Sequence, residues 1–504
     1  MIWIRRLNEY GVSNRVILLL FGLSLFAMAA QIVGLGIFLP IFEYIFQSGL
    51  TQSVDESPSI LLNFINIIIN TIGLKASLES LLISAFLFYL VSQIAIFVIA
   101  YINAYYLGKI IKTVRDRFIQ HYLDADSEYY DRVKIGDFIN ISTSELEWAA
   151  VGVIAPIKLM VSIVSAIGSI IVLLLLSYEL TFYISIIVII ILPYPLSLIS
   201  KTTKVGKQNT EFNSSLVSFL LDRLRSPRLV RLSGTRNSEV KEYSLITEKQ
   251  RGLTLKLHLL KEKVGLTFEP AIIFAALIVL YVALTFLGMQ SSSIILFMVI
   301  TVRLVPILRG ILVQKQSINR TKGPIESIDS LLKEMKLKSQ KDIIPNQKNE
   351  HLIELNYIEN IKLHNVSYSY SSEGLSALSN ISLGFNKGTI NAIIGPSGSG
   401  KSTLIDIIST YRRPSLGKVL FNDLEYNGSE INNLIAYVPQ QPQIFDGKII
   451  DHISYGKKGK LLKDIESASI LSGIHQFIVS LVDGYESILN NNGCLLYTSD
   501  AADE

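Results

Sequence analysis

The sequence predicts a multi-domain chain, in which a polytopic α-helical membrane domain of six transmembrane helices precedes an α/β P-loop domain that is incomplete at its C-terminus. Three observations lead to this prediction. Half of the 504 residues are hydrophobic and only 17% are charged, against roughly 25% in ordinary soluble domains. The shortage of charge lies in roughly the first 315 residues. A glycine-rich phosphate-binding sequence then spans residues 395–403.

Charge and cysteine content exclude two classes of protein. The formal net charge is +4, from 46 basic and 42 acidic residues, which is too small to indicate a nucleic-acid partner. Cys494 is the only cysteine, so a disulfide-stabilised fold is excluded.

Six apolar segments are each long enough to cross a bilayer, which needs about 20 residues in a helix. The first could be a secretory signal at residues 1–30, but its apolar run continues beyond the roughly 7–15 residues of a cleavable signal. We therefore interpret it as a membrane anchor. The predicted spans are Val16–Phe46, Leu78–Leu107, Val151–Leu176, Leu180–Ile199, Leu266–Leu287 and Ile294–Val313.

Lysine and arginine gather in alternate loops, which sets the predicted orientation. They precede the first span and crowd the loops 108–150 and 200–263, whereas the first loop on the other side contains only Lys75. The N-terminus, both long loops and everything after the sixth span are thus expected in the cytoplasm. The first residues, with Trp3, Leu7 and Tyr10, predict a short interfacial helix, with a frayed terminus as the alternative. Both long loops are predicted to continue as helices.

Two arginines belong to the sixth apolar segment. Arg303 lies near its middle, and Arg309 lies one to two turns nearer the cytoplasm. An arginine at membrane depth usually faces a cavity or a partner. We expect either a substrate cavity that receives an anionic or amphiphilic molecule, or pairing with another helix, for example through Glu269.

The composition changes after Val313. An amphipathic, lysine-rich helix at 324–342 and a polar stretch form a predicted linker, and three β-rich runs follow at Ile361–Tyr370, Ile381–Phe385 and Ile390–Ile394. The predicted domain limits are 1–322 for the membrane domain, 323–357 for the linker, 358–493 for the N-terminal part of the P-loop domain and 494–504 for a tail of foreign origin.

The third run leads directly into a complete P-loop. Its glycines allow backbone N–H groups to surround phosphate oxygens at the start of a helix. The lysine can reach the β- and γ-phosphates of ATP, and the Ser402 hydroxyl can bind Mg²⁺. The predicted nucleotide-binding residues are Gly395, Pro396, Ser397, Gly398, Ser399, Gly400, Lys401, Ser402 and Thr403.

Residues 366–403 resemble the opening of an ABC transporter nucleotide-binding domain. The resemblance implies that Tyr370 stacks on adenine, with Tyr368 as the less favoured neighbour. Residues 435–441 resemble the Q-loop of that family, which implies that Gln440 binds Mg²⁺ and contacts the membrane domain; Gln441 is the alternative register. The six spans and two long helical loops are similar to the type 1 transmembrane domain of exporters, whose coupling helices correspond to residues near 126–131 and 234–243.

The resemblance implies a half-transporter in a plasma membrane, such as a bacterial inner membrane. It would pair with a second half, identical or different, and use ATP to export or flip a hydrophobic or amphiphilic substrate, for example a lipid-linked saccharide. The signature motif, acidic Walker B strand, catalytic glutamate and switch histidine of the family are expected after Gly493 but do not occur. We therefore expect a truncated chain that does not hydrolyse ATP as written. A membrane-anchored P-loop protein and a catalytically dead pseudo-subunit are the alternatives.

Overall fold

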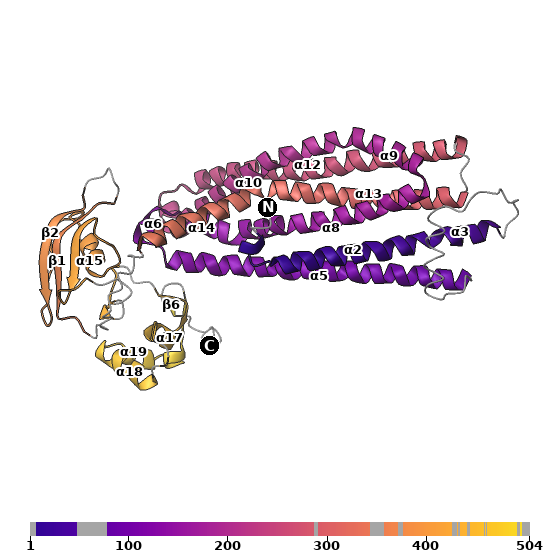
Figure 1. Cartoon of the computed structure of the whole chain (residues 1–504). Helices are drawn as coiled ribbons and strands as arrows, with labels where there is room; N and C mark the ends of the chain where they lie inside the picture. The colour runs from indigo at the N-terminus through magenta and orange to yellow at the C-terminus, as the bar shows by residue number, and fades with distance from the viewer. Residues whose placement is uncertain are drawn as a thin grey trace, which may run out of the picture. The chain divides into compact units, whose positions relative to one another are not determined.

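The computed structural model describes residues 7–47, 78–286, 291–342, 357–370, 376–425, 431, 434–440, 444–457, 459, 461–490 and 494–495. The chain divides into two compact units, Met1–Lys348 and Asn349–Glu504. The first unit is a bundle of long helices, and the second combines two small sheets with short helices (Figure 1). Each unit is described by itself.

Six segments of the helical unit are long and apolar enough to cross a membrane, counted over the described residues. The predicted number is confirmed, and all but the first extend well beyond the predicted apolar cores. The helices are α2 (Asn14–Gly36), α3 (Phe38–Gln47), α5 (Leu78–Leu123), α6 (Ser127–Arg132), α7 (Ile135–Asn140), the π-helix η1 (Ile141–Glu145), α8 (Leu146–Leu176), α9 (Tyr178–Ile191), α10 (Pro193–Arg225), α11 (Pro227–Leu232), α12 (Arg236–Thr285), α13 (Ser291–Arg320) and α14 (Lys322–Asp342).

Prolines interrupt two of the predicted spans. α2 ends at Gly36 and α3 begins at Phe38. Pro40 has no N–H to donate to the carbonyl of Gly36, and its ring crowds that carbonyl, so the helix cannot continue unbroken. Similarly, α10 begins at Pro193, directly after α9, where the fixed φ of proline suits the first turn of a new helix.

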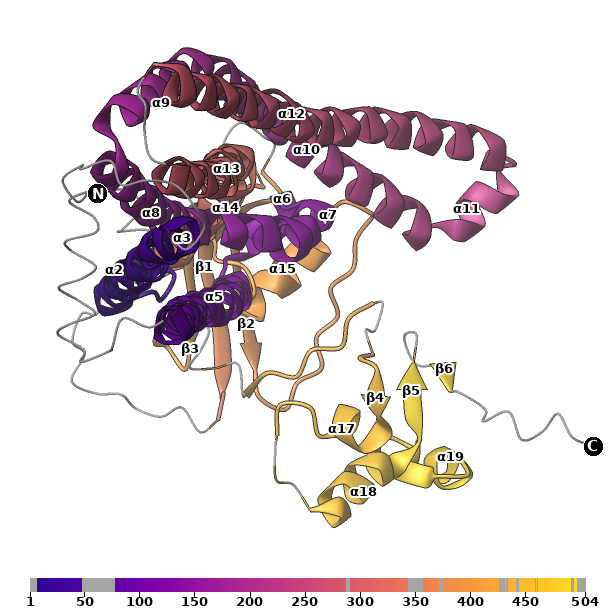
Figure 2. The same ribbon diagram turned by 90° about the vertical axis from the view of Figure 1, so that its right-hand side faces the viewer.

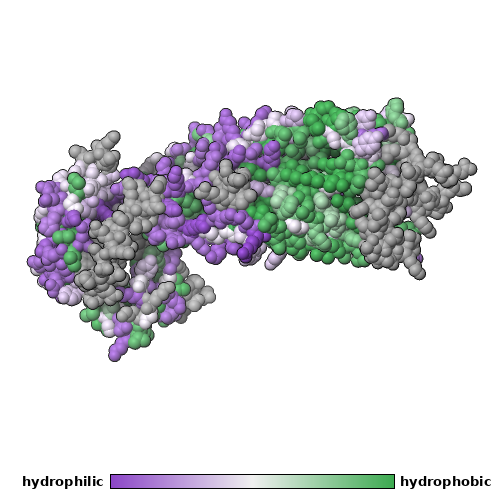
Figure 3. Space-filling view, viewed as in Figure 1, coloured by the Kyte–Doolittle hydropathy of each residue, from purple (hydrophilic) through white to green (hydrophobic). Residues whose placement is uncertain are grey.

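The surface of the helical unit divides into an apolar band and a polar end. Apolar side chains cover the part that contains α9 and the neighbouring lengths of α2, α5, α8 and α13, and polar ones cover the end with α6 and α14 (Figure 3). Exposed Phe86, Phe97, Phe182 and Ile190 contribute to the band. Exposed apolar surface of this extent is expected where lipid is the solvent.

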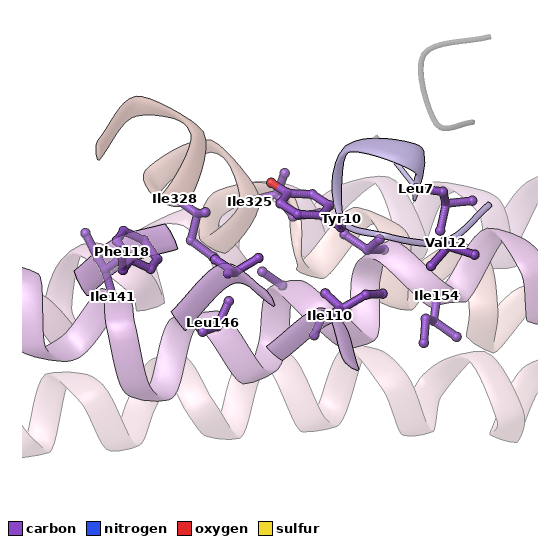
Figure 4. Packing of buried hydrophobic residues seen from close by; sticks show 14 of the residues in the cluster. Leu7, Tyr10, Val12, Ile110, Phe118, Ile141, Leu146, Ile154, Ile325 and Ile328 are labelled. Atoms are coloured by element: carbon purple, nitrogen blue, oxygen red, sulfur yellow. The ribbon is translucent and has the colours of Figure 1, made fainter. Parts of the chain in front are cut away.

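The N-terminal segment packs against protein at the polar end of the unit. Leu7, Tyr10 and Val12 are buried in a cluster with side chains of α5, α8 and α14 (Figure 4). The Tyr10 hydroxyl donates a hydrogen bond to Asp329 Oδ1 at 2.9 Å. Protein side chains therefore cover Leu7 and Tyr10 on one side. The position of this segment at headgroup depth stays a prediction, and Trp3 lies outside the described residues.

Both long loops are helical, as predicted, and each contains a short helix at its turn. α6 follows α5, and Asp126 caps it by accepting a hydrogen bond from the Tyr129 N–H at 2.8 Å. α11 joins α10 and α12, which run side by side (Figure 2). The short helix of the second loop begins about two helical turns before the predicted 234–243, because Pro227 starts α11 and Gly234 lies in the turn before α12.

The second unit contains an antiparallel sheet of β1 (Asn360–Tyr368), β2 (Leu378–Asn386) and β3 (Leu416–Phe421) in the order β2-β1-β3. Leu404 and Ile407 of α15 (Lys401–Ile408) pack with Leu363 and Val366 in its core. A smaller group contains β4 (Gly447–Lys448), α17 (Ile449–Ile453), α18 (Leu462–Leu471), α19 (His475–Val479), β5 (Ile488–Asn490) and β6 (Cys494–Leu495).

The first two predicted strands are confirmed as β1 and β2, but the third prediction is wrong. Residues 390–394 form neither helix nor strand and pair with no strand in the described part of the chain. Ile390 and Ile394 are fully exposed as a result. A strand needs neighbouring strands to satisfy its N–H and C=O groups, and the sheet that contains β1 ends at β2 and β3 on its two edges.

Candidate nucleotide-binding site

The P-loop connects residues 390–394 to α15 and forms a cradle of backbone N–H groups. Gly398 and Gly400 adopt φ values of +80° and +85°, which glycine reaches at little cost. A Cβ at Gly400 would lie 2.5 Å from the carbonyl oxygen of Ala377. In this described segment, the N–H groups of Gly398, Gly400 and Lys401 donate no hydrogen bond within the protein. Unpaired N–H groups at a helix start fit the phosphate oxygens of a nucleotide.

Lys401 and Ser402 begin α15 beside this cradle. Lys401 Nζ donates hydrogen bonds to the carbonyl oxygens of Gly395 and Pro396 at 2.9 and 2.8 Å, so its charge lies over the loop. Ser402 is exposed, whereas Thr403 is buried. The hydroxyl of Ser402 is thus available for a magnesium ion, and that of Thr403 has an internal role. These residues fit both the nucleotide and its metal.

The predicted adenine-stacking residue, Tyr370, contacts the P-loop helix α15 directly. The Tyr370 hydroxyl lies 2.9 Å from Thr403 Oγ1, within hydrogen-bond distance. Its ring contacts Tyr368 edge to face, at 5.2 Å between centroids and an interplanar angle of 88°. Tyr368 is buried and belongs to the core, whereas Tyr370 is half-exposed. Of the two tyrosines, Tyr370 therefore has ring surface available for a base.

Arg412 is a site residue that the sequence prediction missed. Its guanidinium lies 5.0 Å from the ring centroid of Tyr370 and is only 7% exposed. Nε donates to Asp406 Oδ2 at 2.9 Å, and Nη1 donates to the Tyr368 hydroxyl at 3.2 Å. A cation over an aromatic face holds the ring by cation–π attraction. Arg412, which follows α15 and is held by Asp406 of that helix, therefore positions Tyr370. A basic residue nine positions after the P-loop threonine was the only signal for it in the sequence.

The predicted Q-loop residue is not part of this constellation as described. Gln440 lies in an exposed bend after residues 435–439, which form neither helix nor strand. Gln441, the alternative register, lies outside the described residues. The assignment of Gln440 to magnesium therefore stays a prediction.

Arg303, in the apolar part of α13, contacts two other helices. With the Gln31 carboxamide oriented so that its oxygen faces the guanidinium, that oxygen accepts hydrogen bonds from Nε and Nη2, each at 3.0 Å; amide orientation is assigned from such partners. The guanidinium also lies 5.5 Å from the ring centroid of Tyr89. Arg303 therefore has partners on α2 and α5, as expected for a cation that must be satisfied at membrane depth.

Arg309 lines a groove of about 800 Å³ along α12 and α13. Its Nη1 lies 2.5 Å from Glu269 Oε1, the pairing that the sequence analysis considered. Glu262 and Lys263 add one charge of each sign, so the charges that line the groove are balanced. The rest of the lining is mostly apolar and includes Phe274 and Leu277. Arg303 is not among the residues that line this groove.

Two family models match the chain, one on each unit. The ABC transporter transmembrane region matches residues 17–312, and the ABC transporter model matches residues 378–485. The second match begins at β2 and includes the P-loop, α15, Arg412 and Gln440.

Individual relatives agree with the family models. An export ATP-binding/permease protein of Rickettsia felis is 26% identical over 97% of this chain and 81% of its own length. The heterocyst differentiation ATP-binding protein HepA of a Nostoc species is 25% identical over 73% of this chain and 60% of its own length. The ATP-dependent lipid A-core flippase of Chromohalobacter salexigens is 34% identical over 27% of this chain and 24% of its own length. The chain thus spans less than two thirds of two of these three relatives.

Proposed function

The chain belongs to the ABC transporter family, and from this membership we propose that it is a half-transporter that couples ATP to the export or flipping of an amphiphilic substrate. One observation carries the proposal: a P-loop with an unpaired N–H cradle and six membrane-spanning helices are present on one polypeptide. As a family member it is a multi-pass membrane protein with a nucleotide-binding domain.

The site residues suggest how ATP is held. The N–H groups of Gly398, Gly400 and Lys401 and the positive end of α15 attract the phosphates. Lys401 exchanges its two carbonyl acceptors for phosphate oxygens, and the Ser402 hydroxyl binds Mg²⁺, which supplies charge neutralisation. The free face of Tyr370 stacks on the base while Arg412 holds the opposite side of the ring.

The arrangement of charge supports an orientation with the polar end of the helical unit in the cytoplasm. Basic residues are dense in α10, α11 and the first half of α12, as the positive-inside rule expects for a cytoplasmic side. In a bacterium, the membrane is the inner membrane. A second half-transporter, either identical or different, completes the assembly.

The groove along α12 and α13 supports a substrate with both apolar and polar parts. Its apolar wall with Phe274 and Leu277 suits an acyl or other hydrocarbon chain, and the Arg309–Glu269 pair suits hydrogen bonding to a polar head. Because the charges of the lining balance, the groove favours a neutral or zwitterionic head over the anionic one that the sequence analysis considered.

Binding of a fluorescent ATP analogue to the chain in nanodiscs, followed by ATP-dependent flipping of fluorescent zwitterionic lipid in proteoliposomes, tests this function. We expect saturable, Mg²⁺-dependent binding and flipping that needs ATP. Binding without any flipping or other ATP-dependent response of the helical unit would favour a pseudo-subunit, and the absence of binding would refute the proposal.

A further inference from the structure

The most deeply buried acidic side chain of the described helical unit lies at its polar end. Glu145 is 1% exposed and occupies the last position of the π-helix η1, directly before α8. A π-turn inserts an extra residue into a helix and changes the direction of the side chains that follow it, frequently at functional sites. No pattern in the sequence singles out Glu145.

Hydrogen bonds from a second helix hold its carboxyl group. The Thr210 hydroxyl donates to Oε2 at 2.9 Å, and Asn213 Nδ2 donates to Oε1 at 3.2 Å, both from α10. A third helix joins through Asn213, whose Oδ1 accepts a hydrogen bond from Gln250 Nε2 of α12 at 2.7 Å. One buried acid therefore connects α8, α10 and α12.

A fourth helix reaches the same point through Arg320, near the end of α13. Its guanidinium stacks over the ring of Trp148 at 4.1 Å, and both side chains line a cavity of about 20 Å³ together with Glu145 and Asn209. Asn209 Oδ1 is buried and has no hydrogen-bond partner in the protein. A polar cavity of this volume is large enough for one water molecule, which could bridge Asn209 and Arg320.

Two glycines allow α8 and α10 to pack tightly against the end of α13 and the residue that follows it. A Cβ at Gly152 of α8 would lie 1.9 Å from Thr321 Oγ1, and a Cβ at Gly206 of α10 would lie 2.7 Å from the carbonyl oxygen of Arg320. Helices packed this closely have no space in which to slide. The tight packing and the buried hydrogen bonds therefore occur at the same level of the bundle.

We propose that Glu145 is a positioning residue that joins α8, α10, α12 and α13 into one rigid body, so that a displacement applied to α6 or α11 reaches the membrane spans undiminished. The role of this rigid body in transmitting movement rests on the proposed function. The rigidity itself is a property of the helical unit alone, and it can be measured without any nucleotide.

The hydrogen-bonding chemistry explains why a short apolar residue cannot replace Glu145. Removal of the carboxyl group leaves the Asn213 N–H without its buried partner, and it leaves Thr210 Oγ1 with only a long hydrogen bond of 3.4 Å to the Gly206 carbonyl oxygen. An unpaired buried polar group costs roughly 1–3 kcal/mol. The network then reforms with water, and α8 separates from α10. Glutamine keeps one acceptor oxygen for Asn213 and offers an N–H that the Thr210 hydroxyl can accept.

Distance distributions from electron paramagnetic resonance test the proposal. Cys494 is the only natural cysteine, so a Cys494→Ser background allows two spin labels, at the exposed positions Lys134, before α7, and Leu245, on α12. In nanodiscs we expect one narrow distribution of the distance between the two labels, and ATP with Mg²⁺ should not change it. Glu145→Ala should broaden it by about twofold or more, as a local opening does. Glu145→Gln should restore it.

The matched control is Glu147→Ala, which removes an exposed carboxyl group two residues further along, in the first turn of α8, that pairs with Arg115 at 3.4 Å. The narrow distribution should persist in this variant. If Glu145→Ala fails to fold, Thr210→Val, which keeps the shape and removes the hydroxyl, should broaden the distribution. An unchanged width in the folded alanine or valine variant, or no rescue by glutamine, overturns the inference. Binding of the ATP analogue in the same samples separates the two claims: a rigid unit that binds no ATP refutes the proposed function alone, and a distance that shifts on ATP binding refutes the rigid body alone.

Discussion

Arg412→Met is the substitution that tests the nucleotide unit most sharply. The variant keeps a long, flexible side chain but removes a buried cation from Asp406, Tyr368 and Tyr370. The side chains of the ion pair are 7% and 21% exposed. Removing one partner of a fully buried ion pair lowers the free energy of unfolding by about 3–5 kcal/mol. Because Asp406 is partly exposed and regains some solvent, we expect a loss of about 2–4 kcal/mol here. Amide exchange in α15 should then be roughly 30- to 1,000-fold faster.

A double-mutant cycle identifies the ion pair as the cause. Hydrogen–deuterium exchange of the full chain in nanodiscs gives the opening free energy of α15 for Arg412→Met, Asp406→Leu and the double variant. Since the double variant contains no unpaired buried charge, it should be less destabilised than the sum of the single variants by about 0.5–3 kcal/mol, the range for groups in direct contact. Additive effects would show that the two residues do not interact.

The same variant reports on Tyr370. A cation over a partly exposed ring contributes about 0.5–1 kcal/mol, so its loss should weaken binding of the ATP analogue by roughly two- to fivefold. Unchanged affinity in a folded Arg412→Met chain would contradict the positioning role of Arg412.

Three further predictions concern other parts of the chain. Lys401→Ala should weaken ATP-analogue binding by about tenfold or more, since a charge-assisted contact to phosphate is lost. The control Lys418→Ala, which removes an exposed lysine paired with Glu425, should leave the affinity unchanged. Equal effects of the two substitutions would refute the site. Gly152→Ala should lower the thermal unfolding temperature because its Cβ would overlap Thr321, whereas Gly108→Ala, with open space around its Cβ, should not; the reverse order would contradict the packing. Burial, followed by the charge of Glu334, raises the pKa of Tyr129 above its usual value near 10. Above that pH the unfolded state loses a proton that the native state keeps, so the free energy of unfolding falls as pH rises. Tyr129→Phe should remove this pH dependence, and it should cost little stability at neutral pH because the hydroxyl is buried without a hydrogen-bond partner among the described residues. A Tyr129→Phe chain with the same alkaline pH dependence would show that Tyr129 is not responsible.

The six spans and the P-loop could be predicted because both are local in sequence. A span needs only about 20 apolar residues in a row, and the P-loop needs only its spacing, as Gly395 to Thr403 illustrate. The helix at Lys401 follows from the same segment.

Features that depend on distant partners could not be predicted. The apolar run at 390–394 reads as a strand, but its state depends on which strands lie beside it. Arg303 is an unusual residue in any apolar helix, yet its contacts with Gln31 and Tyr89 follow from packing between helices. Glu145 reads as an ordinary charged residue, because neither the π-turn nor Thr210 and Asn213, more than 60 residues away, can be inferred from its neighbours.

The central claim is that nucleotide at the P-loop changes the conformation of the six-helix unit. Hydrogen–deuterium exchange of the full chain in nanodiscs, with and without ATP and Mg²⁺, tests it directly. We predict protection of residues 395–403 together with altered exchange in α6 and α11, and the loss of both effects in Lys401→Ala. Protection of the P-loop with unchanged exchange throughout the helical unit would contradict the claim.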